Sequence, residues 1–275
     1  LTLGSGSSFE IDNSQRKGEG VRDEDDPAAK DAFVINAAIT GADAATFTIN
    51  GAGASDGRAD VSFGTTSNLS GTTLVLENLS TSFTSSGTND HGYRTAASAA
   101  DTVLGTDSIL TIYANNAGTA QTYDLNELSF AGGRINFGEV TLTTDCTDAI
   151  LHVDTLDLSQ AGTIGVQATI DSGFNILDAD TKSFRQTLIE YGSLTENSNP
   201  DNLQPASSEE MDDSAIYAAD DTTVLANVQW SGGLVPKDDA DPNTIAMSYQ
   251  AVALKLAQGG SGDGLVLNAD GHDST

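Results

Sequence analysis

Three histidines are the residues best suited to acid–base chemistry, because imidazole titrates near neutral pH. His91 lies in an Asn-Asp-His-Gly segment, His152 alternates with apolar residues, and His272 lies in an Asp-Gly-His-Asp segment. A Ser-His-Asp triad would need one of them beside an activated serine. No nucleophile elbow, the Gly-x-Ser-x-Gly turn that joins a strand to a helix, supports such a serine. We therefore expect no triad and no enzymatic activity.

Paired carboxylates are the second candidate chemistry. Glycoside hydrolysis uses two carboxyl groups at a defined separation, usually with aromatic platforms for the sugar. The chain has 40 Asp and Glu residues, but aromatic residues make up only 6% and include one tryptophan, Trp230. No pair of acids stands out. A carbohydrate-active enzyme, either a polysaccharide lyase or a hydrolase, is therefore the alternative to a non-catalytic protein.

Two acidic clusters are candidate calcium sites, because Ca²⁺ prefers carboxylate and carbonyl oxygens. The six residues are Asp23, Asp25, Asp26, Asp238, Asp239 and Asp241. Neither cluster matches an EF-hand loop or a Gly-Gly-x-Gly-x-Asp nonapeptide. We expect both to be solvated loops and expect no cofactor. Ca²⁺ binding there is the alternative, and it would suit a calcium-dependent surface-layer module.

The overall charge excludes several classes of partner. The formal net charge is −29, from 11 Lys and Arg against 40 Asp and Glu, and no basic cluster interrupts it. Nucleic acids and anionic lipid headgroups both require clustered cations, so neither is an expected partner. No apolar run approaches the eighteen or so residues of a membrane helix, so we expect no direct membrane insertion. Cys146 is the only cysteine, which excludes an intramolecular disulfide and a cysteine-based zinc site.

Short β-strands are the elements that must position these residues. Between residues 109 and 169, runs of three to seven alternating apolar and polar residues recur, each closed by Gly, Asn, Asp or Ser. Such strands either pair as hairpins in a sandwich or barrel, or stack as rungs of a β-solenoid. Because aromatic residues are scarce, a thin repetitive core is favoured. The expected strands are 109–113, 125–130, 134–137, 139–143, 150–154, 156–158 and 163–169.

The remaining sequence continues the pattern with interruptions. Strands are expected at 1–3, 8–11, 32–35, 45–49, 59–63 and 73–76 before this region, and at several positions up to 267 after it. A short helix over 28–38 is the alternative to the strand at 32–35, because the segment is rich in alanine. We expect a single domain, 1–275, with loop excursions near 13–31, 85–107 and 195–214. Rungs of about 20 to 25 residues would give roughly a dozen turns.

Several segments resemble the passenger domains of bacterial autotransporters, in particular the AIDA-type self-associating adhesins. The resemblance extends over about residues 109–256, and it lies in the general pattern of residues rather than in a diagnostic motif. The segments that carry it are Tyr123-Asp-Leu-Asn-Glu-Leu-Ser-Phe-Ala-Gly-Gly-Arg-Ile-Asn-Phe-Gly138, Leu151-His-Val-Asp-Thr-Leu-Asp-Leu-Ser-Gln-Ala-Gly-Thr-Ile164, Phe174-Asn-Ile-Leu-Asp-Ala-Asp180 and Asp220-Asp-Thr-Thr-Val-Leu-Ala-Asn-Val-Gln-Trp230.

This resemblance implies a right-handed parallel β-helix with protruding loops, exported through the outer membrane and displayed on the bacterial cell surface. It implies adhesion: self-association, biofilm formation or attachment to a host. The partners would be the same protein on neighbouring cells, or a host surface or matrix component. The chain begins within a strand pattern and without an initiator methionine, so we expect a fragment of a longer precursor. A β-sandwich is the alternative fold.

Overall fold

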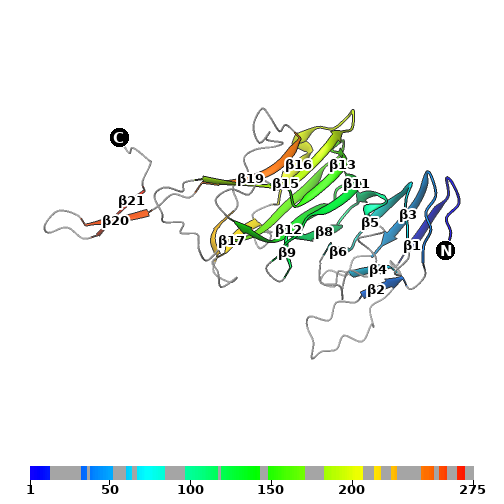
Figure 1. Cartoon of the computed structure of the whole chain (residues 1–275), viewed down its shortest axis with the longest axis horizontal. Helices are drawn as coiled ribbons and strands as arrows, with labels where there is room; N and C mark the ends of the chain where they lie inside the picture. The colour runs from blue at the N-terminus through cyan, green and yellow to red at the C-terminus, as the bar shows by residue number, and fades with distance from the viewer. Residues whose placement is uncertain are drawn as a thin grey trace, which may run out of the picture.

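The structure is a computed structural model, shown in Figure 1. It describes residues 1–12, 32–35, 38–51, 60–63, 67–83, 97–116, 119–142, 148–170, 183–206, 214–217, 224–227, 243–250, 254–258 and 265–269. These residues form mostly strands and almost no helix, so the expected all-β class is confirmed. The strand expected over 32–35 is also confirmed, and the alternative of a helix across those residues is wrong.

The first sheet contains eight strands. Their order is β1-β3-β5-β7-β11-β13-β15-β19, and all neighbours are parallel except β19, which pairs antiparallel with β15. The strands are β1 (Ser8–Asp12), β3 (Ala45–Asn50), β5 (Thr72–Glu77), β7 (Asp101–Leu104), β11 (Tyr123–Phe130), β13 (Leu151–Asp157), β15 (Ser183–Leu194) and β19 (Thr244–Gln250).

The second sheet follows the order β18-β17-β14-β12-β8-β6, with β16 also paired to β14. Its strands are β6 (Ser80–Phe83), β8 (Ile109–Tyr113), β12 (Arg134–Leu142), β14 (Gly162–Ile170), β16 (Leu203–Pro205), β17 (Ser214–Tyr217) and β18 (Val224–Asn227). Three small pairs and one 3₁₀ turn complete the described elements: β2 (Ala32–Ile35) with β4 (Asp60–Phe63), β9 (Asn115–Asn116) with β10 (Thr119–Ala120), β20 (Leu254–Gln258) with β21 (Leu265–Ala269), and η1 (Pro200–Asn202).

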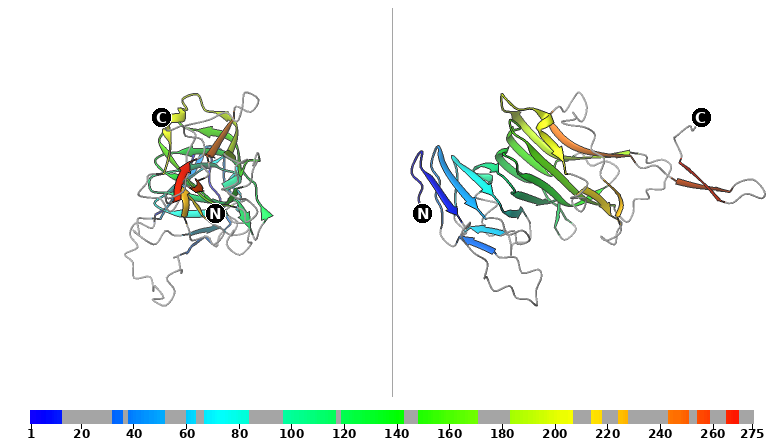
Figure 2. Two further views of the ribbon diagram at one scale, coloured as in Figure 1. Left: turned by 90° about the vertical axis from the view of Figure 1, so that its left-hand side faces the viewer. Right: turned by 180° about the vertical axis from the view of Figure 1, so that it is seen from behind.

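The chain alternates between the two sheets. Each of the consecutive pairs β5–β6, β7–β8, β11–β12 and β13–β14 contributes one strand to each sheet, and we call such a pair a rung. The rungs lie side by side along the long axis of the molecule (Figures 1 and 2). Because each strand pairs in parallel with the strand one rung away, residues at equivalent positions of successive rungs lie next to one another.

Apolar side chains form columns across the rungs. In the first sheet one column contains Phe9, Phe47, Leu74, Thr102, Leu128, Leu156 and Leu194, and the five members between its two ends are fully buried. In the second sheet Phe83, Ile112, Phe137 and Val166 form a matching buried column. Each rung thus adds a few side chains to a core between the sheets, which explains how a chain poor in aromatic residues builds one.

The Gly132-Gly133 turn shows why two glycines join β11 to β12. Gly132 has a φ of 89°, a left-handed conformation that side chains disfavour. At Gly133 a Cβ atom would lie 2.6 Å from the carbonyl oxygen of Leu104 on the previous rung. The amide of Gly133 instead donates to that carbonyl at 3.1 Å. Both residues are needed because the turn packs directly onto the neighbouring turn.

Several expected boundaries are wrong. The expected strands 134–137 and 139–143 form one strand, β12, because Glu139 takes a φ of 54° in a bulge that lets pairing resume at Val140. The strands expected at 150–154 and 156–158 likewise merge into β13. The rungs are also longer than expected: Leu74 pairs with Thr102 and Thr102 with Leu128, which are 28 and 26 residues apart.

The expected loops contain strands. β7 lies within the loop expected at 85–107, and β16 lies within the loop expected at 195–214. Both are short and held by parallel pairing, β7 between β5 and β11 and β16 along β14. Because both strands are short and contain polar residues, the local alternation of apolar and polar residues does not indicate them. The loop expected at 13–31 lies outside the described residues.

Candidate functional site

The side of the first sheet that faces away from the core carries a continuous polar column. Its seven members pair in register from β1 to β15, and all are exposed or half-buried: Ser8, Thr46, Thr73, Asp101, Glu127, Thr155 and Ser193. We call this side of the sheet the outward face. Hydroxyl groups occupy both ends of the column, and two carboxyl groups occupy its middle.

The carboxyl groups in the middle of the outward face interact with one another. Glu127 lies in register between Asp101 and Thr155. Burial raises the pKa of Glu127 above its usual value, and repulsion by Asp101 and then Asp157 raises it further. Asn126 donates its side-chain amide to Asp101 Oδ1 at 2.6 Å. The middle of the outward face therefore combines the Glu127 carboxyl group, whose pKa is raised, with the Asp101 carboxyl group, which accepts a hydrogen bond.

The pKa of Asp157 is shifted in the opposite direction to that of Glu127, below its usual value. Burial acts to raise its pKa, but hydrogen bonds from the Ser159 amide and from the hydroxyl of Thr195 lower it overall. Its Oδ1 accepts from both donors at 2.8 Å. The contact with Thr195 ties the segment after β15 to the turn after β13. Ser198 Oγ accepts from the Leu158 amide at 2.9 Å and reinforces the same connection.

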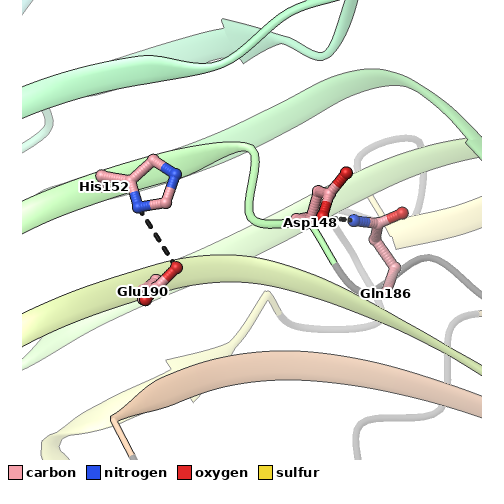
Figure 3. A network of polar contacts seen from close by, with 4 residues as sticks. All are labelled: Asp148, His152, Gln186 and Glu190. Atoms are coloured by element: carbon pink, nitrogen blue, oxygen red, sulfur yellow. Dashed lines mark hydrogen bonds and ion pairs between the residues drawn. The ribbon is translucent and has the colours of Figure 1, made fainter. Parts of the chain in front are cut away.

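His152 lies in a second polar column of the outward face. Asp124, His152 and Glu190 pair in register on β11, β13 and β15. The imidazole Nδ1 lies 3.2 Å from Glu190 Oε2, and the two side chains project from neighbouring strands (Figure 3). Near the start of the same strands, Gln186 Nε2 donates to the Asp148 carbonyl at 3.1 Å. The histidine is therefore paired with an acid, without a serine in the same column.

The structure brings together residues that the sequence did not single out. Asp101, Glu127 and Asp157 come from three different rungs, and only their register places them in one group. The proposed calcium ligands Asp23, Asp25, Asp26, Asp238, Asp239 and Asp241 lie outside the described residues, as do His91, His272 and Cys146. One Gly-x-Ser-x-Gly string does occur, at 53–57. Residues 53–57 lie outside the described residues, and the next described element along the chain is the strand β4 rather than a helix.

The described ranges contain no group of three or more His, Cys, Asp or Glu side chains arranged to hold a metal ion. Within the same ranges, no helix is long and apolar enough to cross a membrane. No protein-family model, curated protein or solved structure matches this chain. The outward face offers a row of hydroxyl and carboxyl groups in register, one on each strand, which is suited to many weak hydrogen bonds.

Proposed function

We propose that this chain is a right-handed parallel β-helix that works as an adhesive surface, by self-association or by binding a host surface or matrix component. The proposal is supported above all by the polar column of the outward face, which continues across seven strands without an apolar interruption. The alternation of the chain between two sheets whose strands mostly pair in parallel favours a β-helix over a β-sandwich, because sandwich strands commonly pair antiparallel through hairpins.

Adhesion suits this chemistry because each outward hydroxyl or carboxyl group contributes one weak contact. Parallel strands lie about 4.8 Å apart, so the column presents its groups at regular intervals to a partner. Contacts repeated along a rigid surface act together, since after the first has formed the others are held in place. Affinity then depends on the length of the column rather than on a pocket. Display on the bacterial cell surface by an autotransporter pathway is part of the same proposal.

A substitution in the column tests this function. Thr155→Lys places a long cation at the sixth of the seven positions in the outward column, and Thr46→Lys does so at the second position, four strands away. Thr111→Lys is the matched control, because Thr111 is a half-buried threonine in β8 of the second sheet. Cells that display the protein should clump less with either outward-face variant and normally with the control. Equal clumping by all three variants would contradict the proposal.

A carbohydrate-active enzyme is the second candidate, and one observation favours it. Burial and repulsion by Asp101 raise the pKa of Glu127, and Asp101 lies in register with it on the neighbouring strand. A carboxyl group with a raised pKa near a second carboxyl group is the kind of pair that glycosidic bond cleavage uses. Glu127→Gln and Asp101→Asn would each abolish such an activity. If the purified chain shortens a polysaccharide and both variants fail to do so, the enzyme replaces the adhesin as the proposed function.

A further inference from the structure

Strand β1 is one of the two edge strands of the first sheet, and the other is β19. Strand β1 pairs with β3 on one side and has no neighbour on the other among the described residues. At the opposite end the sheet finishes with β19, which pairs antiparallel with β15 and so ends the parallel stack. The N-terminal end lies at one extremity of the molecule (Figures 1 and 2). An edge of this kind is a template for another strand.

The apolar core also reaches the surface at this edge. The described residues include three large exposed hydrophobic side chains, and two of them, Leu1 and Phe9, belong to this end, with exposed fractions of 49% and 37%. Phe9 stacks on the fully buried Phe47 with ring centroids 5.7 Å apart and planes 14° apart. The apolar column of the first sheet therefore finishes in a partly exposed aromatic ring that has a neighbour in register on one side only.

The backbone of β1 has the polarity needed to accept a further strand. The Ser7 carbonyl accepts from the Thr46 amide at 2.8 Å, so it points toward β3. Successive residues of a strand direct their amide and carbonyl groups to alternate sides, and Ser8 and Glu10 therefore direct theirs toward the open edge. These two residues supply donors and acceptors on that side.

We propose that β1 pairs antiparallel with β1 of a second copy of this chain, joining two molecules end to end about a two-fold axis. The register places Phe9 opposite Phe9 of the second copy and Ser8 opposite Glu10 of the second copy. Ser8 and Glu10 then exchange amide–carbonyl hydrogen bonds, and the two-fold axis repeats them. Phe9 and Phe47 of both copies form one continuous aromatic column.

Charge selects this register over its neighbour. A shift by two residues would place Glu10 opposite Glu10 of the second copy, and like charges directly opposite one another are unfavourable. In the proposed register each Glu10 carboxylate faces a serine hydroxyl, which can donate to it. Two copies of β1 that pair antiparallel are related by a two-fold axis, which is the symmetry of most protein dimers. This pairing uses the end of the stack and does not depend on the adhesive role of the outward face.

Sedimentation velocity of the purified chain tests the proposal. We expect a monomer–dimer equilibrium, which Glu10→Pro weakens by about tenfold or more in Kd, because it removes an amide that the pairing uses. Proline is tolerated where the amide faces away from the sheet, so the melting temperature of the dilute monomer should not change. Glu10→Gln keeps the amide and should keep the dimer. Thr155→Lys should also keep it, which separates this contact from the adhesive face.

Spin labels establish the geometry of the dimer. With Cys146 replaced by serine, a label on Thr2→Cys should give a short distance between copies, and a label on Glu196→Cys a long one. A chain that stays monomeric up to submillimolar concentration would overturn the proposal. So would a dimer that Glu10→Pro leaves intact, or one in which the Glu196 labels are the closer pair.

Discussion

His152 Nδ1 lies 3.2 Å from Glu190 Oε2 on the neighbouring strand, and the two side chains are 42% and 47% exposed. The contact is an ion pair only when the imidazole is protonated. On the other side of His152, in register, lies Asp124. A cation at position 152 would therefore have a carboxylate on each neighbouring rung, whereas a neutral imidazole leaves two acids in one column without a charge between them.

The first prediction concerns this column. His152→Gln should destabilise the protein by less than about 1 kcal/mol, because a contact between two exposed side chains contributes little. Urea unfolding of both proteins measures the difference in the free energy of unfolding. A loss of several kcal/mol would show that the imidazole contributes by packing rather than through its contact with Glu190.

The second prediction concerns Glu127, whose pKa is raised by burial and then by repulsion from Asp101 and Asp157. Because the folded protein holds this proton more tightly than the unfolded chain does, stability falls as the pH rises from 4.5 through the folded pKa. Glu127→Gln should therefore stabilise the protein at pH 7, by about 0.5 kcal/mol, and not at pH 4. Thermal unfolding at both pH values measures this, and Glu196→Gln serves as the exposed control.

The third prediction concerns Asp157, whose pKa is lowered because hydrogen bonds from Ser159 and Thr195 outweigh the effect of burial. The stability that it contributes is present above its unfolded pKa of 3.8 and is lost as the pH falls through the folded pKa. Asp157→Asn should cost about 1 kcal/mol at pH 7 and progressively less as the pH is lowered below 3.8. Asp154→Asn, at an exposed position of the same strand, should cost much less. Equal losses at the two positions would refute this account.

The fourth prediction concerns Thr102, which replaces an apolar residue in the buried column of the first sheet. Its side chain is fully buried, and its Oγ1 has no hydrogen-bond partner within the described residues. Thr102→Val replaces that hydroxyl with a methyl group of similar size and should stabilise the protein by about 1 kcal/mol. Leu128→Ala, one rung away, should destabilise it by about 2–5 kcal/mol. A loss of stability in Thr102→Val would mean that the hydroxyl is satisfied in solution.

The fifth prediction concerns the proposed self-association. With a net charge of −29, two copies repel one another at low ionic strength. Salt screens this repulsion over a length of about 10 Å at 0.1 M, so lateral association should strengthen from low to moderate salt. Light scattering over a salt series measures the effect. Association that weakens over this range would indicate attraction between opposite charges, which the proposed contacts do not use.

The local pattern of the sequence was sufficient for the fold class and for many strands. β2 and β8 begin and end where alternation of apolar and polar residues predicts. The alternation in β3 and β5 also identifies which side chains are buried, since a strand places successive residues on opposite faces. Each of these properties depends on residues only a few positions apart, which is why the sequence alone determined them.

The tertiary structure decided the outward face. Glu127 lies in register with Asp101, and Thr155 with Ser193, on neighbouring parallel strands, although the partners are 26 and 38 positions apart in the sequence. The segments between strands vary in length, so no fixed period in the sequence marks these partners. His152 was visible as an alternating residue, but Glu190 became its partner only when β15 was placed beside β13. Local alternation selects the face of a side chain, whereas register between distant strands selects its neighbours, and the candidate site consists of those neighbours.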